Sequence, residues 1–265
     1  MITVENLSVV FNKGTPLERR ALKNLSLEIG DGEFCSVIGS NGAGKSTLLA
    51  AIAGDIPPES GRILLAGRDM TRRSARTRAA LTARVFQDPL AGSCGALTIG
   101  ENLALAAKRG KRRFLGPALG RKALAAIRER VAELGIGLEK RLDQPMGSLS
   151  GGQRQALALV MATLAPSSVV LLDEHTAALD PANAEFVLGL TATLAARFGL
   201  SVLMVTHSMR QALDLGTRTI MLHEGEIVFD VRDPARRALT IEDLVARFRQ
   251  ARGGQELAED RLLAS

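Results

Sequence analysis

The chain has 265 residues and 46% hydrophobic content, enough for one large domain or two small ones with a real core. Its net charge of +6 and its pI of about 9.9 indicate an anionic partner of some kind. Because Trp and Tyr are absent, surfaces that stack nucleic-acid bases are not expected. The longest apolar run, Ala156–Ala165, would span only about 15 Å as a helix, half of a bilayer core of about 30 Å. No membrane span is therefore expected, and no signal peptide either, because Met1–Val10 lacks a basic head and an apolar run.

The first segments of the chain are expected to be strands. Apolar and polar residues mix over Ile2–Phe11, and they alternate over Leu22–Ile29 as in a half-buried antiparallel strand. Phe11 ends the first of these strands. An apolar strand residue usually fills the core, although the ring of Phe11 could also stack on an adenine.

A phosphate-binding pattern follows at Gly39–Thr47, which reads Gly-Ser-Asn-Gly-Ala-Gly-Lys-Ser-Thr and matches G-x-x-x-x-G-K-[ST]. It lies between an apolar strand, Phe34–Ile38, and a Leu- and Ala-rich helix, Ser46–Ala53. The glycines let backbone N–H groups face a phosphate, Lys45 adds a positive charge, and the Ser46 hydroxyl can bind Mg²⁺. The residues expected to contact the ligand are Gly39, Ser40, Asn41, Gly42, Ala43, Gly44, Lys45, Ser46 and Thr47. A plain glycine-rich turn with a solvated lysine is the alternative.

Basic residues form two groups in the next part of the chain. The first group is Arg68, Arg72, Arg73, Arg76, Arg78 and Arg84, and the second is Lys108, Arg109, Lys111, Arg112 and Arg113. They could face acidic lipid headgroups or nucleic acid, or they could be an ordinary solvated surface, and the sequence leaves both open.

A helical insertion is expected over residues 88–166. A strand ends at Val85–Pro89, which places Gln87 at a strand-to-loop junction within reach of a bound ligand. Apolar residues then recur at three- and four-residue spacing, which predicts helices over Thr98–Ala107 and Arg121–Leu134. Leu149–Gln153 reads Leu-Ser-Gly-Gly-Gln and precedes a helix at Arg154–Leu164. It is either a second anion site or a common loop.

Polar side chains end two apolar strands in the last third of the chain. Val169–Glu174 reads as a buried parallel strand whose terminal carboxylates lie where ligands bind in open α/β sheets. Asp173 is placed to hold Mg²⁺ and Glu174 to accept a proton from water, although the pair could simply cap a helix. His207 ends the strand Val202–Thr206 in the same way, so that we expect it to contact the ligand.

The C-terminal part is expected to contain a hairpin and one amphipathic helix. Glu224 and Gly225 separate two short strands, and Thr240 with Asp243 resembles a capping box. After Gly253 the tail becomes polar and is expected to fray.

The order of these motifs resembles the ATP-binding subunit of ABC transporters over about residues 2–250. Leu149–Gln153 is the most specific marker, since it stands as the family's L-S-G-G-Q in full, and the P-loop, Gln87, Val169–Glu174, Ala178–Asp180 and His207 accompany it in the family's order. The resemblance implies an α/β fold, with a P-loop NTPase core of mostly parallel strands, an antiparallel β subdomain and a helical subdomain. One domain would cover residues 1–250, with the core at 1–87 and 167–235, the helical part at 88–166, and a C-terminal helix and tail at 236–265.

The same resemblance implies a role for each site residue. Two copies would pack head to tail around two molecules of ATP with Mg²⁺. Glu174 would be the general base, His207 would hold the γ-phosphate and the water, and Gln87 would link the nucleotide to a transmembrane partner. Metal ligands would be Ser46, Gln87 and Asp173. Ser150, Gly151, Gly152 and Gln153 would act on the other copy's ATP, Asp180 would lie at the dimer seam, and Phe11 would stack on adenine.

Two departures from the family pattern narrow the expectation. Phe11 replaces the usual Tyr, and His175 stands where most relatives carry Pro. The variant Asp-Glu-His-Thr-Ala-Ala-Leu-Asp resembles a subgroup of bacterial importers that work with permease subunits and a periplasmic solute-binding protein, with amino acids as cargo. His175 would also place a titratable group beside Glu174 and so tune its pKa. The subunit would then lie on the cytoplasmic face of the inner membrane, with no specific nucleic acid as partner.

Other classes remain open at this point. A non-transport ATPase of the same family is one alternative, and a basic nucleic-acid-binding ATPase is another. A single motif set and the lack of sustained heptads argue against the DNA-repair and ribosomal relatives.

Overall fold

The structure is a computed structural model that describes residues 1–111 and 120–251. Its strands are β1 (Ile2–Phe11), β2 (Arg19–Ile29), β3 (Phe34–Gly39), β4 (Ser60–Leu65), β5 (Arg68–Asp69), β6 (Thr82–Val85), β7 (Val169–Asp173), β8 (Ser201–Val205), β9 (Arg218–His223) and β10 (Glu226–Arg232). Its α-helices are α1 (Lys45–Ala53), α2 (Ala75–Arg78), α3 (Ile99–Ala107), α4 (Arg121–Ala132), α5 (Gly151–Leu164), α6 (Pro181–Phe198), α7 (Met209–Asp214) and α8 (Ile241–Ala251). Three short 3₁₀ turns cover Leu138–Lys140, Met146–Ser148 and Ala235–Ala238.

Two sheets organise the molecule. The first has the strand order β2-β1-β4-β5 and is antiparallel throughout. The second has the order β10-β9-β3-β8-β7-β6, in which only the edge pair β9–β10 is antiparallel. The parallel strands bring the carboxyl ends of β3, β7 and β8 to one edge, where ligands bind in folds of this kind. The α/β fold with an antiparallel N-terminal sheet is therefore confirmed.

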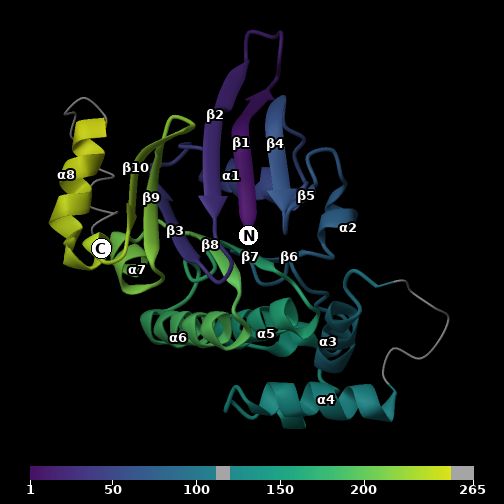
Figure 1. Ribbon diagram of the computed structural model, residues 1–265. Coiled ribbons are helices and arrows are strands. Elements are labelled where there is room, and N and C mark those ends of the chain that lie inside the picture. The colour runs from purple at the N-terminus through teal and green to yellow at the C-terminus, as the bar shows by residue number, and fades with distance from the viewer. Residues whose placement is uncertain (112–119, 252–265) are drawn as a thin grey trace.

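Helix α1 lies behind the antiparallel sheet and packs between the two sheets (Figure 1). It is apolar on nearly every side, as expected of a helix that is covered all round. Leu48, Leu49 and Ile52 pack against Ile2 of the first sheet and Val37 of the second in one core. This core therefore fixes the start of α1 relative to both sheets.

The opposite face of the parallel sheet is covered by α5 and α6, and the helical part lies beyond them (Figure 1). Helices α3, α4 and α5 share a separate core that includes Leu103, Val131 and Leu157. Helix α8 closes a fourth core with α7, in which Leu244 and Phe248 are buried. The Thr240–Asp243 capping box is confirmed, because Asp243 Oδ2 accepts from the Thr240 N–H at 2.8 Å.

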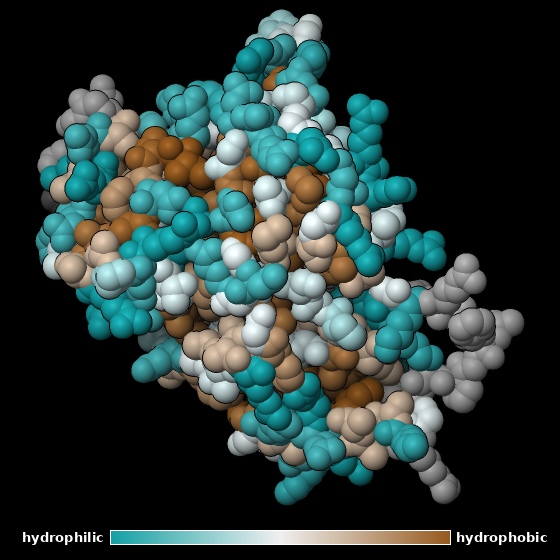
Figure 2. Space-filling model, viewed as in Figure 1, coloured by the Kyte–Doolittle hydropathy of each residue, from teal (hydrophilic) through white to brown (hydrophobic). Residues whose placement is uncertain are grey.

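Hydrophobic residues gather in two places on the face shown in Figure 2. One lies beside α8, the other lies over the helices of the lower half, and hydrophilic residues separate them. No helix among residues 1–111 and 120–251 combines the length and apolar character needed to cross a membrane.

One expectation changes with the structure, and others cannot be compared with it. Helix α5 begins at Gly151 and not at Arg154, because Ser150 caps it and accepts a hydrogen bond from the Gln153 N–H at 3.3 Å. Arg112 and Arg113 of the second basic group, and the tail after Gly253, lie outside the described residues.

Candidate functional site

The glycine loop after β3 is shaped by close backbone contacts. Gly39 and Gly44 have φ values of 149° and 105°, a region that side chains rarely adopt. A Cβ at Gly39 would lie 2.2 Å from the Leu222 carbonyl oxygen, and a Cβ at Gly44 would lie 2.6 Å from that of Ala21. Only glycine therefore allows the loop to turn between β3 and α1 at these two positions.

Lys45 is the first residue of α1 and is held over the loop. Its side chain is buried, and its Nζ donates to the carbonyl oxygens of Gly39 at 2.8 Å and Ser40 at 3.0 Å. The first turn of α1 contains no acidic residue. The N–H groups at the helix start, its positive dipole end and a lysine charge together favour a bound anion such as a phosphate.

A hydroxyl and a carboxylate meet beside this loop. Ser46 on α1 lies 3.4 Å from Asp173 at the end of β7, measured from Oγ to Oδ1. The other oxygen of Asp173, Oδ2, accepts from Arg84 Nη2 at 2.7 Å. Among the residues that the structure describes, no group of three or more His, Cys, Asp or Glu side chains could hold a metal. Mg²⁺ needs only one or two protein oxygens beside phosphate and water, so the Ser46–Asp173 pair fits it.

Glu174 and His207 form a close pair at the same edge of the sheet. His207 Nε2 lies 2.6 Å from Glu174 Oε1, and Glu174 is the less exposed of the two. Because His207 donates a hydrogen bond, and because His207 and Lys45 add positive charge, the pKa of Glu174 is lowered in spite of partial burial. The carboxylate is therefore ionised at neutral pH and able to accept a proton.

The backbone of Glu174 is itself unusual. Its φ of 47° is left-handed, which costs energy for a residue other than glycine, and its N–H donates to the Val205 carbonyl at 3.0 Å. This conformation turns the chain out of β7. A cavity of about 150 Å³ lies next to the pair and is lined in part by Thr206, Ser208 and Gln211. It is large enough to hold water beside the carboxylate.

The expectation that Phe11 fills the core is wrong. Its side chain is 36% exposed at the end of β1, although the alternation of β1 buries Leu7 and Val9 before it. Phe11 is paired with Arg19 on β2, and Arg19 Nη2 donates to the Gly42 carbonyl of the glycine loop at 2.8 Å. The ring therefore belongs to the same end of the molecule as the phosphate-binding loop.

The Leu-Ser-Gly-Gly-Gln segment is built into the start of α5. Ser150 and Gln153 form a reciprocal capping box. Gly152 packs against the start of α6, where a Cβ would lie 2.4 Å from Asn183 Oδ1. Asn183 is held in turn by Asp180, whose Oδ1 accepts from the Asn183 N–H at 3.0 Å and caps α6. The segment therefore packs against the start of α6, which Asp180 caps.

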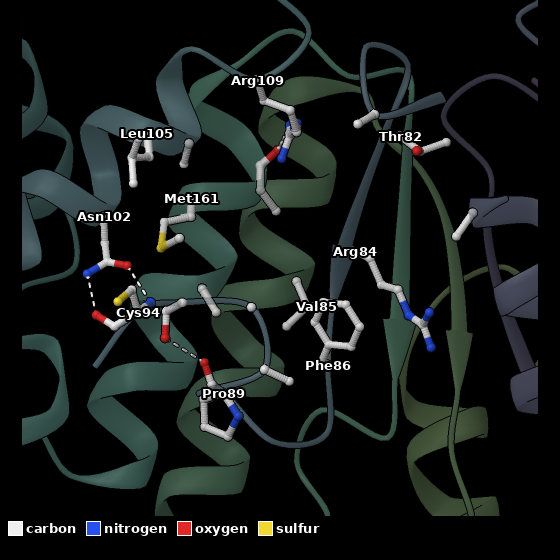
Figure 3. A pocket seen from close by; sticks show the side chains of 18 of the residues that line it. Thr82, Arg84, Val85, Phe86, Pro89, Cys94, Asn102, Leu105, Arg109 and Met161 are labelled. Atoms are coloured by element: carbon white, nitrogen blue, oxygen red, sulfur yellow. Dashed lines mark hydrogen bonds between the residues drawn. The ribbon is translucent and has the colours of Figure 1, made fainter. Parts of the chain in front are cut away.

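A groove of about 550 Å³ opens beyond Gln87, between the parallel sheet and the helical part (Figure 3). Gln87 is exposed, two residues after β6, and Val85 of β6 pairs with Leu172 next to Asp173. Phe86 and Pro89 line the groove from this segment, and Met161 lines it from α5. The groove and the Asp173 edge are thus joined by one short stretch of chain.

Comparison with known proteins decides the family. The profile of the family described as "ABC transporter" matches residues 22–177. The chain is 43% identical to the tyrosine transport ATP-binding protein of Clostridioides difficile over 251 residues, which cover 95% of this chain and 100% of that protein. The chain belongs to the ABC transporter family. It is an ATP-binding subunit of that family and an ATP hydrolase.

Further relatives and solved structures support the assignment of this ABC ATPase to the family. It is 33% identical to the methionine import ATP-binding protein of Geobacillus kaustophilus, covering 86% of this chain and 64% of that protein. Its fold matches a dimeric, post-hydrolysis ATP-binding cassette bound to ADP and Pi with a TM-score of 0.74 and 28% identity, covering 88% of this chain and 98% of that one. The structure of cbiO1 from Clostridium perfringens, part of the ABC transporter complex cbiONQ, matches with a TM-score of 0.73 and 25% identity, over 96% of both chains.

The side chain of His175 in this ABC ATPase points into the core, where it cannot have the role suggested for it, the tuning of Glu174. It is 2% exposed, and its Nε2 lies 3.0 Å from Thr191 Oγ1 on α6. Because Thr191 donates its own hydroxyl to the Val187 carbonyl, His175 Nε2 must donate to Thr191. Burial lowers the pKa of His175 to about 4. A neutral, buried ring does not add charge beside Glu174, so that the tuning suggested from the sequence is not supported.

Parts of both basic groups serve the fold. Arg78 is buried and donates to the carbonyl oxygens of Ala51 and Ile52 near the end of α1, at 2.6 and 2.9 Å. Arg109 donates to the Ala162 carbonyl at the end of α5 at 2.8 Å. These arginines donate hydrogen bonds to carbonyl oxygens near helix ends, where the helix itself provides no donor, and they are therefore not available as a surface patch.

Sequence reasoning missed two arginines next to the site. Arg19 holds the Gly42 carbonyl, and Arg84 holds Asp173. A signal for Arg84 was present, because it is a charge inside an otherwise uncharged strand that runs beside the Asp173 strand. Arg19 lies in a loop-like stretch of sequence, where no pattern distinguishes it from its neighbour Arg20.

Proposed function

We propose that this ABC ATPase powers the import of a small solute, in particular an amino acid such as tyrosine. The observation that carries the proposal is the 43% identity to a tyrosine transport ATP-binding protein over the whole of that protein. The methionine import relative supports the same direction of transport. The working assembly would comprise permease subunits and a periplasmic solute-binding protein, with the ATPase on the cytoplasmic face of the inner membrane.

The proposed chemistry is in-line attack of water on the γ-phosphate. Glu174 is ionised, lies beside a water-sized cavity and accepts the proton, while His207 holds the carboxylate and the water in place. Lys45 and the N–H groups of the loop stabilise the charge that develops on the phosphate oxygens. Ser46, Asp173 and Gln87 would hold Mg²⁺, which offsets phosphate charge when bound.

The proposed site is completed by a second copy. Ser150, Gly151, Gly152 and Gln153 would contact ATP held on the glycine loop of the partner, with Asp180 at the seam. The capping box at the start of α5 supports this assignment, because it presents a helix N-terminus without an acidic residue in its first turn. The dimeric cassette among the structural neighbours supports it as well. Phe11 would stack on adenine at the near side of the loop.

The groove of Figure 3 is the proposed docking place for a cytoplasmic segment of the permease. Its lining is mostly apolar and comes from the Gln87 segment, from α3 and from α5, so a docked segment would contact both parts of the ATPase. Closure of the dimer on ATP and its reopening after hydrolysis would move this groove and switch the permease. The proposed organisation is a single domain over residues 1–250, with the helical part at 88–166.

Glu174→Gln tests the chemistry. The variant should bind ATP with the affinity of the natural chain and lose at least about 100-fold in turnover, since a general base contributes about 10² to 10⁴. Glu185→Gln, a carboxylate change on α6, is the matched control and should leave turnover unchanged. Hydrolysis by Glu174→Gln at the natural rate would remove Glu174 as the base.

The cargo needs a separate test. The ATPase is combined with its permease subunits in proteoliposomes, and ATP turnover and uptake are measured with the solute-binding protein loaded with tyrosine, methionine or a sugar. Stimulation by an amino acid with uptake into the compartment that faces the ATPase supports the proposal. Stimulation by none of these, or movement in the opposite direction, contradicts it.

A further inference from the structure

Arg84 contacts Asp173 and the groove, which the proposed mechanism treats separately, and a further carboxylate, Asp55. Its Nη2 donates to Asp173 Oδ2 at 2.7 Å, and its Nη1 donates to Asp55 Oδ2 at 2.6 Å. Its guanidinium carbon lies 4.6 Å from the centre of the Phe86 ring, and the side chain lines the groove of Figure 3. One cation thus contacts the carboxylate at the end of β7, a second carboxylate after α1, and the docking groove.

The guanidinium is held firmly in this position. The Arg84 side chain is 18% exposed and that of Asp173 is 14% exposed, so that water screens the pair only in part. The Nε of Arg84 is buried and has no hydrogen-bond partner within the described parts of the chain. The two Nη atoms of Arg84 are thus paired with carboxylates while its Nε is left unpaired, which shows that the two carboxylates determine the orientation of the guanidinium.

We propose that Arg84 is a resident cation at Asp173 that makes binding of a divalent metal depend on nucleotide. The guanidinium neutralises Asp173 through Oδ2, whereas Oδ1 faces Ser46. A metal ion arriving alone meets a carboxylate whose charge Arg84 already offsets in part, and it is repelled by the guanidinium. The phosphates of a nucleotide supply the additional negative charge that makes metal binding favourable. Arg84 acts through Asp173 and is therefore a positioning residue.

Asp55 divides the charge of Arg84 and sets the strength of this effect. With Asp55 present, the guanidinium is shared between two carboxylates. Without it, the whole charge of Arg84 would act on Asp173. The proposal therefore predicts opposite effects for Arg84 and for its second carboxylate partner: loss of Arg84 strengthens metal binding, and loss of Asp55 weakens it. A purely structural role would disturb the site in the same direction in both cases.

Manganese binding to the full chain tests this, with Mn²⁺ in place of Mg²⁺ and free Mn²⁺ followed by electron paramagnetic resonance. Titrations are made without nucleotide and with a non-hydrolysable ATP analogue. Arg84→Gln should bind Mn²⁺ roughly tenfold more tightly than the natural chain when nucleotide is absent, and its gain from nucleotide should shrink by the same factor. Arg84→Lys keeps the charge and should behave like the natural chain, while Asp55→Asn should bind more weakly.

The inference rests on the proposed metal site, and the two can fail separately. If the natural chain binds no Mn²⁺ even with the analogue, the metal site itself is wrong. If it binds Mn²⁺ with the analogue but Arg84→Gln is no tighter without it, or if Arg84→Gln and Arg84→Lys change alike, only the role of Arg84 is overturned. Should Arg84→Gln fail to fold, Asp55→Asn decides, because unchanged or tighter binding there contradicts the shared-charge argument. Adding Ser46→Ala to Arg84→Gln should remove the gain and so locates the bound ion.

Discussion

The buried His175 makes the stability of this ABC ATPase depend on pH in a way that one substitution should remove. Burial lowers its pKa from 6.5 to about 4, so the folded protein does not take up a proton that the unfolded chain takes up readily. A depressed histidine pKa costs nothing above pH 6.5. As pH falls below 6.5 stability is lost, and the loss is complete near pH 4. The full difference is worth about 3 kcal/mol, and about 2 kcal/mol of it has been lost at pH 5.

His175→Gln removes the ionisable group and keeps a side chain that can donate to Thr191. The free energy of unfolding is measured in urea at pH 7.5, 6 and 5 for both proteins. The natural chain should lose about 2 kcal/mol more than the variant between pH 7.5 and pH 5, because all other titrating groups are common to both. ATP turnover of the two proteins should keep the same pH dependence between 6 and 8. Parallel stability curves would show that His175 is not buried neutral, and the reasoning would fail.

Three further predictions concern the start of α5, the end of α1 and the adenine side of the loop. Gly152→Ala should lower Tm by several degrees and weaken ATP-driven dimerisation measured by light scattering, because the added Cβ would lie 2.4 Å from Asn183 Oδ1. The control is Gly189→Ala on α6, where a Cβ would meet nothing within 4 Å, and it should leave Tm unchanged or raise it. Arg78→Met should cost about 3 kcal/mol or more in thermal unfolding, since it leaves carbonyl oxygens at the end of α1 unpaired, whereas the exposed Arg76→Met should cost almost nothing. Phe11→Ala should weaken binding of a fluorescent ATP analogue by about tenfold, since stacking on a base contributes about 1 to 3 kcal/mol, and Phe11→Tyr should leave binding unchanged. Equal binding by the natural chain and both variants would exclude Phe11 from the adenine site.

Local patterns predicted the centre of the site because they fix local geometry. The glycines between β3 and α1 dictate the loop, and parallel strands bring their carboxyl ends together wherever they occur. Glu174 directly follows β7 and His207 lies two residues after its neighbour β8, so their 2.6 Å approach follows from the order of the strands. The start of α5 was also within reach, because Ser150 followed three residues later by Gln153 is a capping-box signature.

The sequence did not predict the direction of side chains at the ends of strands. Alternation along β1 should bury Phe11, but the strand continues past the edge of the core and leaves the ring exposed. The left-handed turn at Glu174 reverses which side of the chain faces inward, and this sends His175 into the core against α6. Neither event has a signature in composition or spacing, since both depend on where a distant element ends.

The positive charge of the chain shows how far composition can mislead. A net charge of +6 indicates an anionic partner only if the cations face solvent. Arg78 and Arg109 donate to helix-end carbonyls, Arg236 is buried against the Ala212 and Leu213 carbonyls, and Arg84 is shared between two carboxylates. Each of these arginines keeps its formal charge, but its N–H donors bind groups within the fold, where a phosphate backbone or a lipid headgroup cannot reach them. The anion site that we propose is therefore formed by the loop N–H groups and Lys45, and it does not depend on the number of arginines.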